Sequence, residues 1–188
     1  MNYELLKSIN GLAGQVGWID DIMKFATNYA VHVFAVVLLL MWFFGKEQMK
    51  KTVVYSAISG AVGILVNVLI SKIYFEARPF VTHDDIHVLV DHAADASFPS
   101  DHTTGAIALA FAIALRHKKL GVIMMLFALL TGFSRIYVGN HYPGDVLAGI
   151  IVGILVAWIF SKMKWLVNPI ANFIISIYNA IPLLPKKM

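Results

Sequence analysis

Five apolar runs, separated by short polar segments, dominate the hydrophobic pattern of this 188-residue chain. A helix needs about 20 mostly apolar residues to cross a membrane. The first, second and fourth runs come close to this length or exceed it, and the third and fifth do so when extended toward their N-terminal ends. The expected spans are Ile22–Phe44, Val53–Phe75, Thr103–Leu115 (from near Pro99), Leu120–Val138 and Val146–Phe160 (from Pro143).

The two ends of the chain carry amphipathic patterns instead. Residues 3–16 place leucine, isoleucine and valine at helical spacing among Glu4, Lys7 and Ser8, which predicts a helix at the membrane surface. A second helix is expected over residues 165–185. Within it, Trp165–Leu184 is apolar except for one polar stripe, consisting of Asn168, Asn172, Ser176 and Asn179. This stripe suits an interfacial helix, and a sixth span is the competing interpretation.

Composition agrees with a membrane protein. Hydrophobic residues make up 59% of the chain and charged residues only 14%, whereas a soluble domain has about a quarter charged. These values argue against a soluble globular enzyme, a disordered chain and a nucleic-acid binder, and the absence of cysteine excludes disulfides and thiolate metal sites. We therefore expect a single all-α domain, residues 1–188 with a core over 20–160. It is a polytopic membrane helical bundle of five transmembrane helices (six possible) with interfacial N- and C-terminal helices.

Basic residues gather in alternate connections between the runs. They are Lys46, Lys50 and Lys51, then Arg116, Lys118 and Lys119, then Lys162 and Lys164. Short connections rich in lysine and arginine stay in the cytoplasm. Residues 76–100 are then expected to form an extracytoplasmic loop, and residues 139–144 lie on the same side.

Polar groups, which are costly to place in or beside a membrane, cluster on that expected outer side in three segments. One contains Arg78, and the next reads Pro99-Ser100-Asp101-His102. The third joins the fourth and fifth runs, with Ser134-Arg135 followed by His141 and Asp145. Ionisable groups at a membrane edge are usually functional, and two arginines beside two histidines suit an anionic ester.

The residue types suggest roles in phosphoryl transfer. Arg78 and Arg135 offer planar donor forks that match phosphate oxygens, and Ser100 begins a helix whose free amides favour anions. Asp145, four residues after His141, can accept from one ring nitrogen and leave the other free to attack. His102 would then supply the proton for the leaving group.

These motifs resemble the type 2 phosphatidic-acid phosphatase superfamily of membrane lipid phosphatases. The family pattern combines Lys…Arg-Pro, Pro-Ser-x-His and Ser-Arg-x5-His-x3-Asp, and the last two are matched here at full spacing. The resemblance implies that His141 forms a phosphohistidine, Asp145 orients it and His102 protonates the leaving oxygen. Arg78, Ser100 and Arg135 would bind the phosphate, without a metal or another cofactor.

The bacitracin-resistance branch of that family is the most similar in size and local sequence, for example in Tyr74–Phe80 and Ala93–His102. Its members are undecaprenyl-diphosphate phosphatases, so the resemblance implies a bacterial plasma-membrane enzyme facing the extracytoplasmic side. It would remove the terminal phosphate of the C55 isoprenoid diphosphate, recycle the carrier for peptidoglycan synthesis and confer bacitracin resistance. The expected partners are this substrate and membrane lipids, not nucleic acid.

Two other functions stay open. A broader phosphatase acting on phosphatidylglycerophosphate or phosphatidate would use the same residues. A small transporter or channel would instead distribute polar residues through the membrane depth, whereas here they gather at one end.

Two positions depart from the family pattern. Its lysine stands seven residues before the arginine, but that position is Ser71 here, and Lys72 is only six residues before Arg78. Six residues turn a helix about 120° away from the same face, so a phosphate-binding role for Lys72 is doubtful. The other departure is Asp101, where the family mostly has glycine.

The loop Thr82–Asp95 is rich in histidine and aspartate. Its i, i+4 pairs could hold a divalent cation, and a solvated acidic loop explains them equally well. A lid over the polar end of the substrate is the third interpretation.

Overall fold

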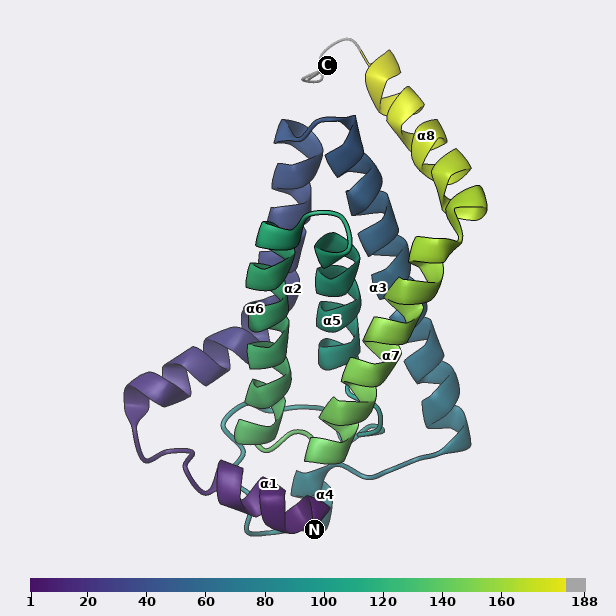
Figure 1. Ribbon diagram of the computed structural model, residues 1–188. Helices are drawn as coiled ribbons and strands as arrows, with labels where there is room; N and C mark the ends of the chain where they lie inside the picture. Colours follow the sequence, from purple (N-terminus) through teal and green to yellow (C-terminus); the bar gives the residue numbers. More distant parts are fainter. Residues whose placement is uncertain (182–188) are drawn as a thin grey trace.

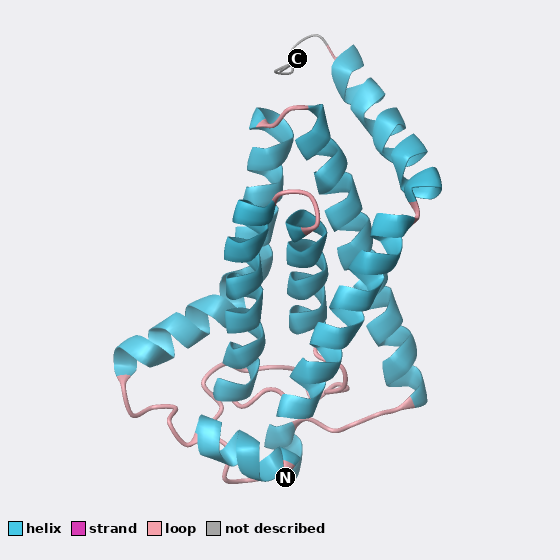
Figure 2. Ribbon diagram, in the orientation of Figure 1, coloured by secondary structure: helices cyan, strands magenta, loops and turns pink. Residues whose placement is uncertain are grey.

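Every regular element in residues 1–181, the part that the structure describes, is a helix (Figures 1 and 2). In this computed structural model eight helices follow one another in this part of the chain. They are α1 (Asn2–Asn10), α2 (Gly17–Phe44), α3 (Glu47–Ile73), α4 (Pro79–Thr82), α5 (Asp101–Ala114), α6 (Lys118–Tyr137), α7 (Pro143–Lys162) and α8 (Lys164–Ala180).

Four of these helices, α2, α3, α6 and α7, are long and apolar enough to cross a membrane. The expected all-helical membrane bundle is therefore confirmed. The third expected span is helix α5, which has only 14 residues and falls short of the roughly 20 that a span needs. The expected count of five spans is thus not established by the lengths of the described helices.

Helix α5 forms the centre of the bundle and packs against α3, α6 and α7. Small residues allow the close approach to α7, since a Cβ atom at Gly153 would lie 2.8 Å from the carbonyl oxygen of Thr104. Toward the other end of α5, Ile107 and Ile113 are fully buried in a core shared with Phe34 of α2. This packing fixes the beginning of α5, where the candidate residues stand.

The outer faces of the long helices carry large exposed apolar side chains. Examples are Leu39 and Leu40 on α2, Leu65 and Leu69 on α3, Ile123 and Leu126 on α6, and Ile151 and Leu155 on α7. Such a surface has no stable partner in water but suits the hydrocarbon of a bilayer. The chain is a multi-pass membrane protein.

Both terminal helices differ in detail from the expected ones. Helix α1 ends at Asn10, not at residue 16, because the chain turns at Gly11 and adopts a positive φ of 81° at Gly14. Helix α8 buries Val167 and Ala171 against α3, where Asn168 accepts a 2.8 Å hydrogen bond from the hydroxyl of Tyr55. Residues 182–184 of the expected C-terminal helix lie outside the described residues.

The connections divide between two ends of the bundle, as Figure 1 shows. The lysine-rich connections α2–α3, α5–α6 and α7–α8 lie toward the end of the bundle away from α1. At the opposite end, α1, α4 and the loop of residues 83–100 surround the end of α6 and the beginning of α7. The three polar segments identified in the sequence thus meet at one end of the molecule.

Candidate active site

The centre of the candidate site is a buried pair, His141 and Asp145. His141 Nδ1 lies 3.2 Å from Asp145 Oδ2, and both side chains are almost completely buried. Asp145 stands in the first turn of α7, where its Oδ2 also accepts a 2.9 Å hydrogen bond from the backbone amide of Tyr142. The start of the helix therefore fixes the carboxylate that orients the imidazole.

Arg78 contacts the other nitrogen of the same ring. Its Nη1 lies 3.0 Å from His141 Nε2 and also donates a 3.0 Å hydrogen bond to the carbonyl of Asn140. A guanidinium can only donate, so Nε2 is the acceptor and the ring proton is on Nδ1, facing Asp145. This tautomer leaves the Nε2 lone pair on the side of the arginine.

Arg135 brings a second guanidinium to this end of the bundle, from the last turn of α6. Its Nη1 donates a 2.7 Å hydrogen bond to Thr27 Oγ1, while Nε and Nη2 are buried without a hydrogen-bond partner among residues 1–181. Unsatisfied buried donors are costly, and an anionic ligand would satisfy them. The residue thus fits a phosphate group.

Ser100 comes to the site with the beginning of α5. Its backbone amide donates a 3.1 Å hydrogen bond to the carbonyl of Asp145, and its buried hydroxyl accepts one of 2.9 Å from Thr103. Because the hydroxyl accepts from Thr103, its own proton remains available to a ligand.

The segment between α6 and α7 folds back tightly to place His141. The amides of Asn140 and His141 both donate to the carbonyl of Arg135, each at 3.1 Å. Gly139 makes this turn with a φ of 87°, and a Cβ atom there would lie 2.7 Å from Ile86. Only glycine meets both the positive φ and the close approach of the loop.

His102 lies in the first turn of α5 and is half-buried. Its ring centroid is 6.4 Å from that of His92, which belongs to the loop before α5. The neighbouring Asp101 accepts a 2.8 Å hydrogen bond from Asn67 Nδ2 of α3. The unexpected aspartate is thus bound to a buried amide, and this contact ties the beginning of α5 to α3.

Lys72 is the one predicted phosphate-binding residue that the structure does not bring into this network. It lies in the last turn of α3 with an exposed side chain, and no described residue forms a hydrogen bond or ion pair with it. The six-residue offset from Arg78 agrees with this placement, because it turns the side chain to another face.

An apolar groove runs from His102 along α5, between α2 and α3. Its volume is about 370 Å³. The lining is made mostly of alanine, glycine and aliphatic residues, including Val31, Ala57, Gly60, Ala61 and Leu109. Val31, Ala57 and Ala61 are exposed on the outside of their helices, so the groove opens toward the lipid.

The electrostatic environment favours a neutral His141. Burial, together with the positive charges of Arg135 and Arg78, lowers the pKa of His141 well below 6.5. In the loop before α5, burial tends to raise the pKa of Asp95. Its hydrogen bond and ion pair with Arg78 outweigh this effect, so the pKa of Asp95 is lowered. Burial also lowers the pKa of His92.

The histidines and aspartates of the loop Thr82–Asp95 do not converge on one point. Within residues 1–181, no group of three His, Asp or Glu side chains is arranged to hold a metal ion. Asp85 instead forms a 2.6 Å ion pair with Lys7 and accepts a hydrogen bond from Tyr3, which attaches the loop to α1.

The sequence analysis did not identify two residues of this site. Ser97 Oγ donates to Asp145 Oδ2 and lies 3.3 Å from His141 Nδ1, and Asp95 Oδ1 accepts a 2.7 Å hydrogen bond from Arg78 Nε. Both lie in an irregular loop, where periodicity gives no signal. Their position shortly before the Pro99-Ser100 motif was the only available indication.

Fold and site together define an integral membrane protein with a histidine–aspartate pair beside two buried arginines. The chain belongs to the PAP2 superfamily, whose model matches residues 51–169. This confirms the family resemblance drawn from the motifs.

Two relatives match nearly the whole chain. Undecaprenyl-diphosphatase BcrC of Bacillus subtilis is 48% identical over 181 residues, covering 96% of this chain and 93% of that protein. The putative undecaprenyl-diphosphatase YbjG of Escherichia coli is 30% identical, covering 88% and 84%. The expected bacitracin-resistance branch is thereby confirmed, and so is the expectation that the chain is a phosphatase.

Two solved structures have the same fold. The crystal structure of Aquifex aeolicus LpxE has a TM-score of 0.68 and 27% identity, covering 86% of this chain and 94% of that one. A PAP2-type phosphatidylglycerolphosphate phosphatase from B. subtilis has a TM-score of 0.61 at 19% identity, covering 86% and 85%. The second likeness concerns the fold alone.

Proposed function

We propose that this chain hydrolyses undecaprenyl diphosphate to the monophosphate, through a phosphohistidine on His141, at the outer face of the bacterial plasma membrane. The observation that carries the proposal is the arrangement of His141, with Nδ1 on Asp145 and Nε2 beside Arg78. The likeness to an undecaprenyl-diphosphatase at 48% identity supports the choice of substrate.

In the first step, Nε2 of neutral His141 attacks the terminal phosphorus as the bond to the bridging oxygen breaks. His102 donates a proton to that oxygen, and the lipid monophosphate leaves. The developing negative charge on the phosphoryl oxygens is stabilised by Arg78, by the unpaired donors of Arg135 and by the hydroxyl of Ser100. Asp145 stabilises the positive charge that forms on the imidazole.

In the second step, His102 accepts a proton from water, which attacks the phosphorus and breaks the phosphorus–nitrogen bond. Inorganic phosphate is released and the neutral imidazole of His141 is restored. His102 thus regains the proton that it gave to the leaving group, so the cycle closes.

The apolar groove beside His102 suits the isoprenoid tail. It begins at the residue that would protonate the bridging oxygen and opens toward lipid along α2 and α3. Apart from Asp101 and His102 at one end, the groove lining is apolar, which suits the isoprenoid tail.

The outer orientation is supported by the separation of charge between the two ends of the bundle. The site lies opposite the lysine-rich connections, which favour the cytoplasm. Cysteine introduced at Lys118 should resist a membrane-impermeant thiol reagent in intact cells, while cysteine at Asp85 should react. The reverse labelling would contradict this orientation.

Turnover by the purified protein tests the substrate. We expect C55 diphosphate to be hydrolysed with a higher kcat/KM than phosphatidylglycerophosphate or phosphatidate, with and without chelator. Faster hydrolysis of the glycerolipids would favour the broader phosphatase, and activity lost in chelator and restored by one metal would contradict the metal-free reaction. Bacitracin resistance, which the name of a relative from Bacillus licheniformis suggests, should rise with expression of the chain and not with expression of His141→Ala.

A further inference from the structure

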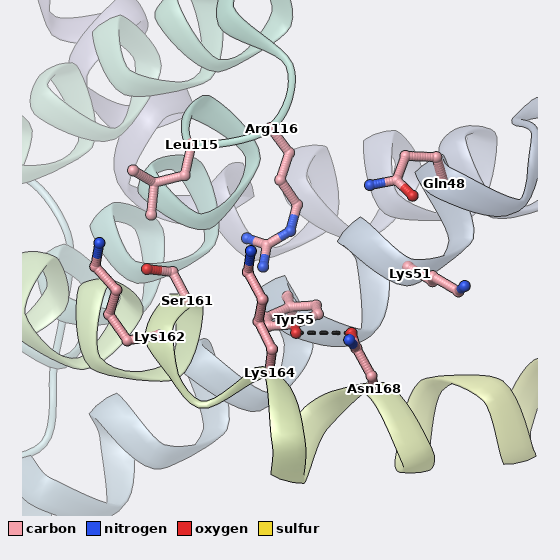
Figure 3. A pocket seen from close by; sticks show the side chains of 9 residues that line it. All are labelled: Gln48, Lys51, Tyr55, Leu115, Arg116, Ser161, Lys162, Lys164 and Asn168. Atoms are coloured by element: carbon pink, nitrogen blue, oxygen red, sulfur yellow. Dashed lines mark hydrogen bonds between the residues drawn. The ribbon is translucent and has the colours of Figure 1, made fainter.

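A polar cavity lies at the end of the bundle opposite the candidate active site (Figure 3). Its volume is about 720 Å³, nearly twice that of the apolar groove. The first turns of α3, the α5–α6 connection, the end of α7 and the beginning of α8 all contribute to it. The lining residues are Gln48, Lys51, Tyr55, Leu115, Arg116, Ser161, Lys162, Lys164 and Asn168.

The cavity lining contains four cationic side chains and no carboxylate. Lys51 is paired at 2.8 Å with Glu47, which lies outside the lining. Arg116, Lys162 and Lys164 form no ion pair with any described residue. Three unpaired charges of the same sign around one cavity repel one another, and an anion would offset this repulsion.

Arg116 is held in place as a binding group would be. Its guanidinium carbon lies 3.6 Å from the ring centroid of Tyr55, and the hydroxyl of this buried tyrosine is hydrogen-bonded to Asn168. Stacking fixes the plane of the guanidinium, and Nη1 donates a long 3.5 Å hydrogen bond to the carbonyl of Ala112. A guanidinium has five N–H donors, so others remain for phosphate oxygens. In Figure 3, Lys164 reaches from the start of α8 toward this guanidinium.

Two tryptophans place the cavity at the level of lipid headgroups. Trp158 near the end of α7 and Trp165 at the start of α8 are both exposed, and Lys162 Nζ lies 5.8 Å from the ring centroid of Trp158. Tryptophan is enriched where a membrane meets water. A ligand in this cavity is therefore within reach of the headgroups in the adjacent leaflet.

We propose that this cavity binds the phosphate of an anionic phospholipid from the leaflet opposite the active site. The preference of lysine-rich connections for the cytoplasm explains why lysines lie at this end of the bundle. It does not explain why a stacked arginine and two lysines without ion pairs surround one cavity. The bound headgroup joins α3, α7 and α8, and thereby stabilises the docking of α8. The proposal depends on membrane insertion and is independent of the proposed substrate.

The test is lipid binding by the full-length protein in detergent, measured by native mass spectrometry with phosphatidylglycerol and with phosphatidylcholine. The variant Arg116→Gln/Lys164→Gln is compared with Lys118→Gln/Lys119→Gln, which removes the same charge from exposed residues at the same end. We expect phosphatidylglycerol to bind the wild type and the control alike, and the cavity variant roughly tenfold more weakly or worse. Phosphatidylcholine should not distinguish the three proteins.

Equal phosphatidylglycerol binding by the cavity variant and its control would overturn the proposal. Displacement of the lipid by millimolar inorganic phosphate would assign the cavity to a soluble anion and overturn the choice of a lipid. If the double cavity variant fails to fold, Lys162→Gln against Lys118→Gln makes the same comparison with one charge. An Arg116→Lys variant that binds as tightly as the wild type would contradict the role of the stacked guanidinium.

Discussion

Asp95 Oδ1 accepts a 2.7 Å hydrogen bond from Arg78 Nε, so the loop before α5 holds the arginine that contacts His141. Arg78 is buried and uses Nη1, on the other edge of the guanidinium, to contact Asn140 and His141. One planar side chain thereby joins the loop to the turn between α6 and α7. A change in the loop therefore acts directly on the group proposed to bind phosphate.

The first prediction compares two cations that the sequence offers for phosphate binding. Arg78→Gln should lower kcat/KM roughly 10²–10³-fold, because it removes a buried charge at the proposed transition state. Lys72→Gln should change kcat/KM by less than about threefold, because Lys72 is exposed and outside the network. Steady-state kinetics on C55 diphosphate measures both, and an equal loss in the two variants would refute the distinction.

The second prediction concerns Ser97, which contacts both members of the histidine–aspartate pair. Ser97→Ala should lower kcat about tenfold with little change in KM, because the hydroxyl orients the pair and is not proposed to touch substrate. Ser71→Ala is a matched control, since the one hydrogen bond of the Ser71 hydroxyl within the described residues goes to the carbonyl of Val68 in its own helix. A raised KM with unchanged kcat in Ser97→Ala would place the hydroxyl on the substrate instead.

The third prediction tests the apolar groove. Ala61→Phe places a ring where we expect the isoprenoid tail, so KM for C55 diphosphate should rise roughly tenfold. A short-chain isoprenoid diphosphate should be affected much less. Val122→Phe, on the outer face of α6, supplies a control that is also exposed but lies away from the groove. Equal effects on the long and the short substrate would mean that the tail lies elsewhere.

The fourth prediction concerns pH. Because burial and two arginines lower the pKa of His141 below 6.5, its ring stays neutral as the pH falls through 6.5. The loss of kcat/KM caused by protonation of His141 should therefore lie below pH 6.5. Arg78→Gln removes one of the charges that lower this pKa, so the acid limb should move to higher pH. Titration of the substrate itself would leave the limb in the same place in both proteins.

Hydrophobic periodicity predicted most of the fold, since helices α2, α3, α6 and α7 each contain most of an expected span. Where this prediction was wrong, individual residues determined where a helix begins or ends. The pattern of residues 3–16 continued past Gly11 and Gly14, which end the helix. Helix α5 begins only at Asp101, so the expected extension toward Pro99 is absent, and α3, α6 and α7 pack around it.

The residues of the candidate site that lie at helix ends could be predicted from the sequence. Arg135, His141 and Asp145 follow a fixed spacing around one turn, and the structure brings them to the same end as Arg78 and Ser100. Ser97 and Asp95 were not predictable, because their contacts depend on the path of an irregular loop. The basic cavity combines residues from four segments that no spacing relates.

The central claim is that His141 is the nucleophile, and the most direct measurement is acid-labile phosphorylation of this residue during turnover. The protein is mixed with C55 diphosphate carrying a labelled terminal phosphate, quenched in alkali within milliseconds and digested for mass spectrometry. We predict a phosphoryl group on the peptide containing His141, formed and lost at rates that account for turnover, and absent in His141→Ala. Turnover that persists in His141→Ala, or a burst of lipid monophosphate without a phosphorylated peptide, would contradict the account.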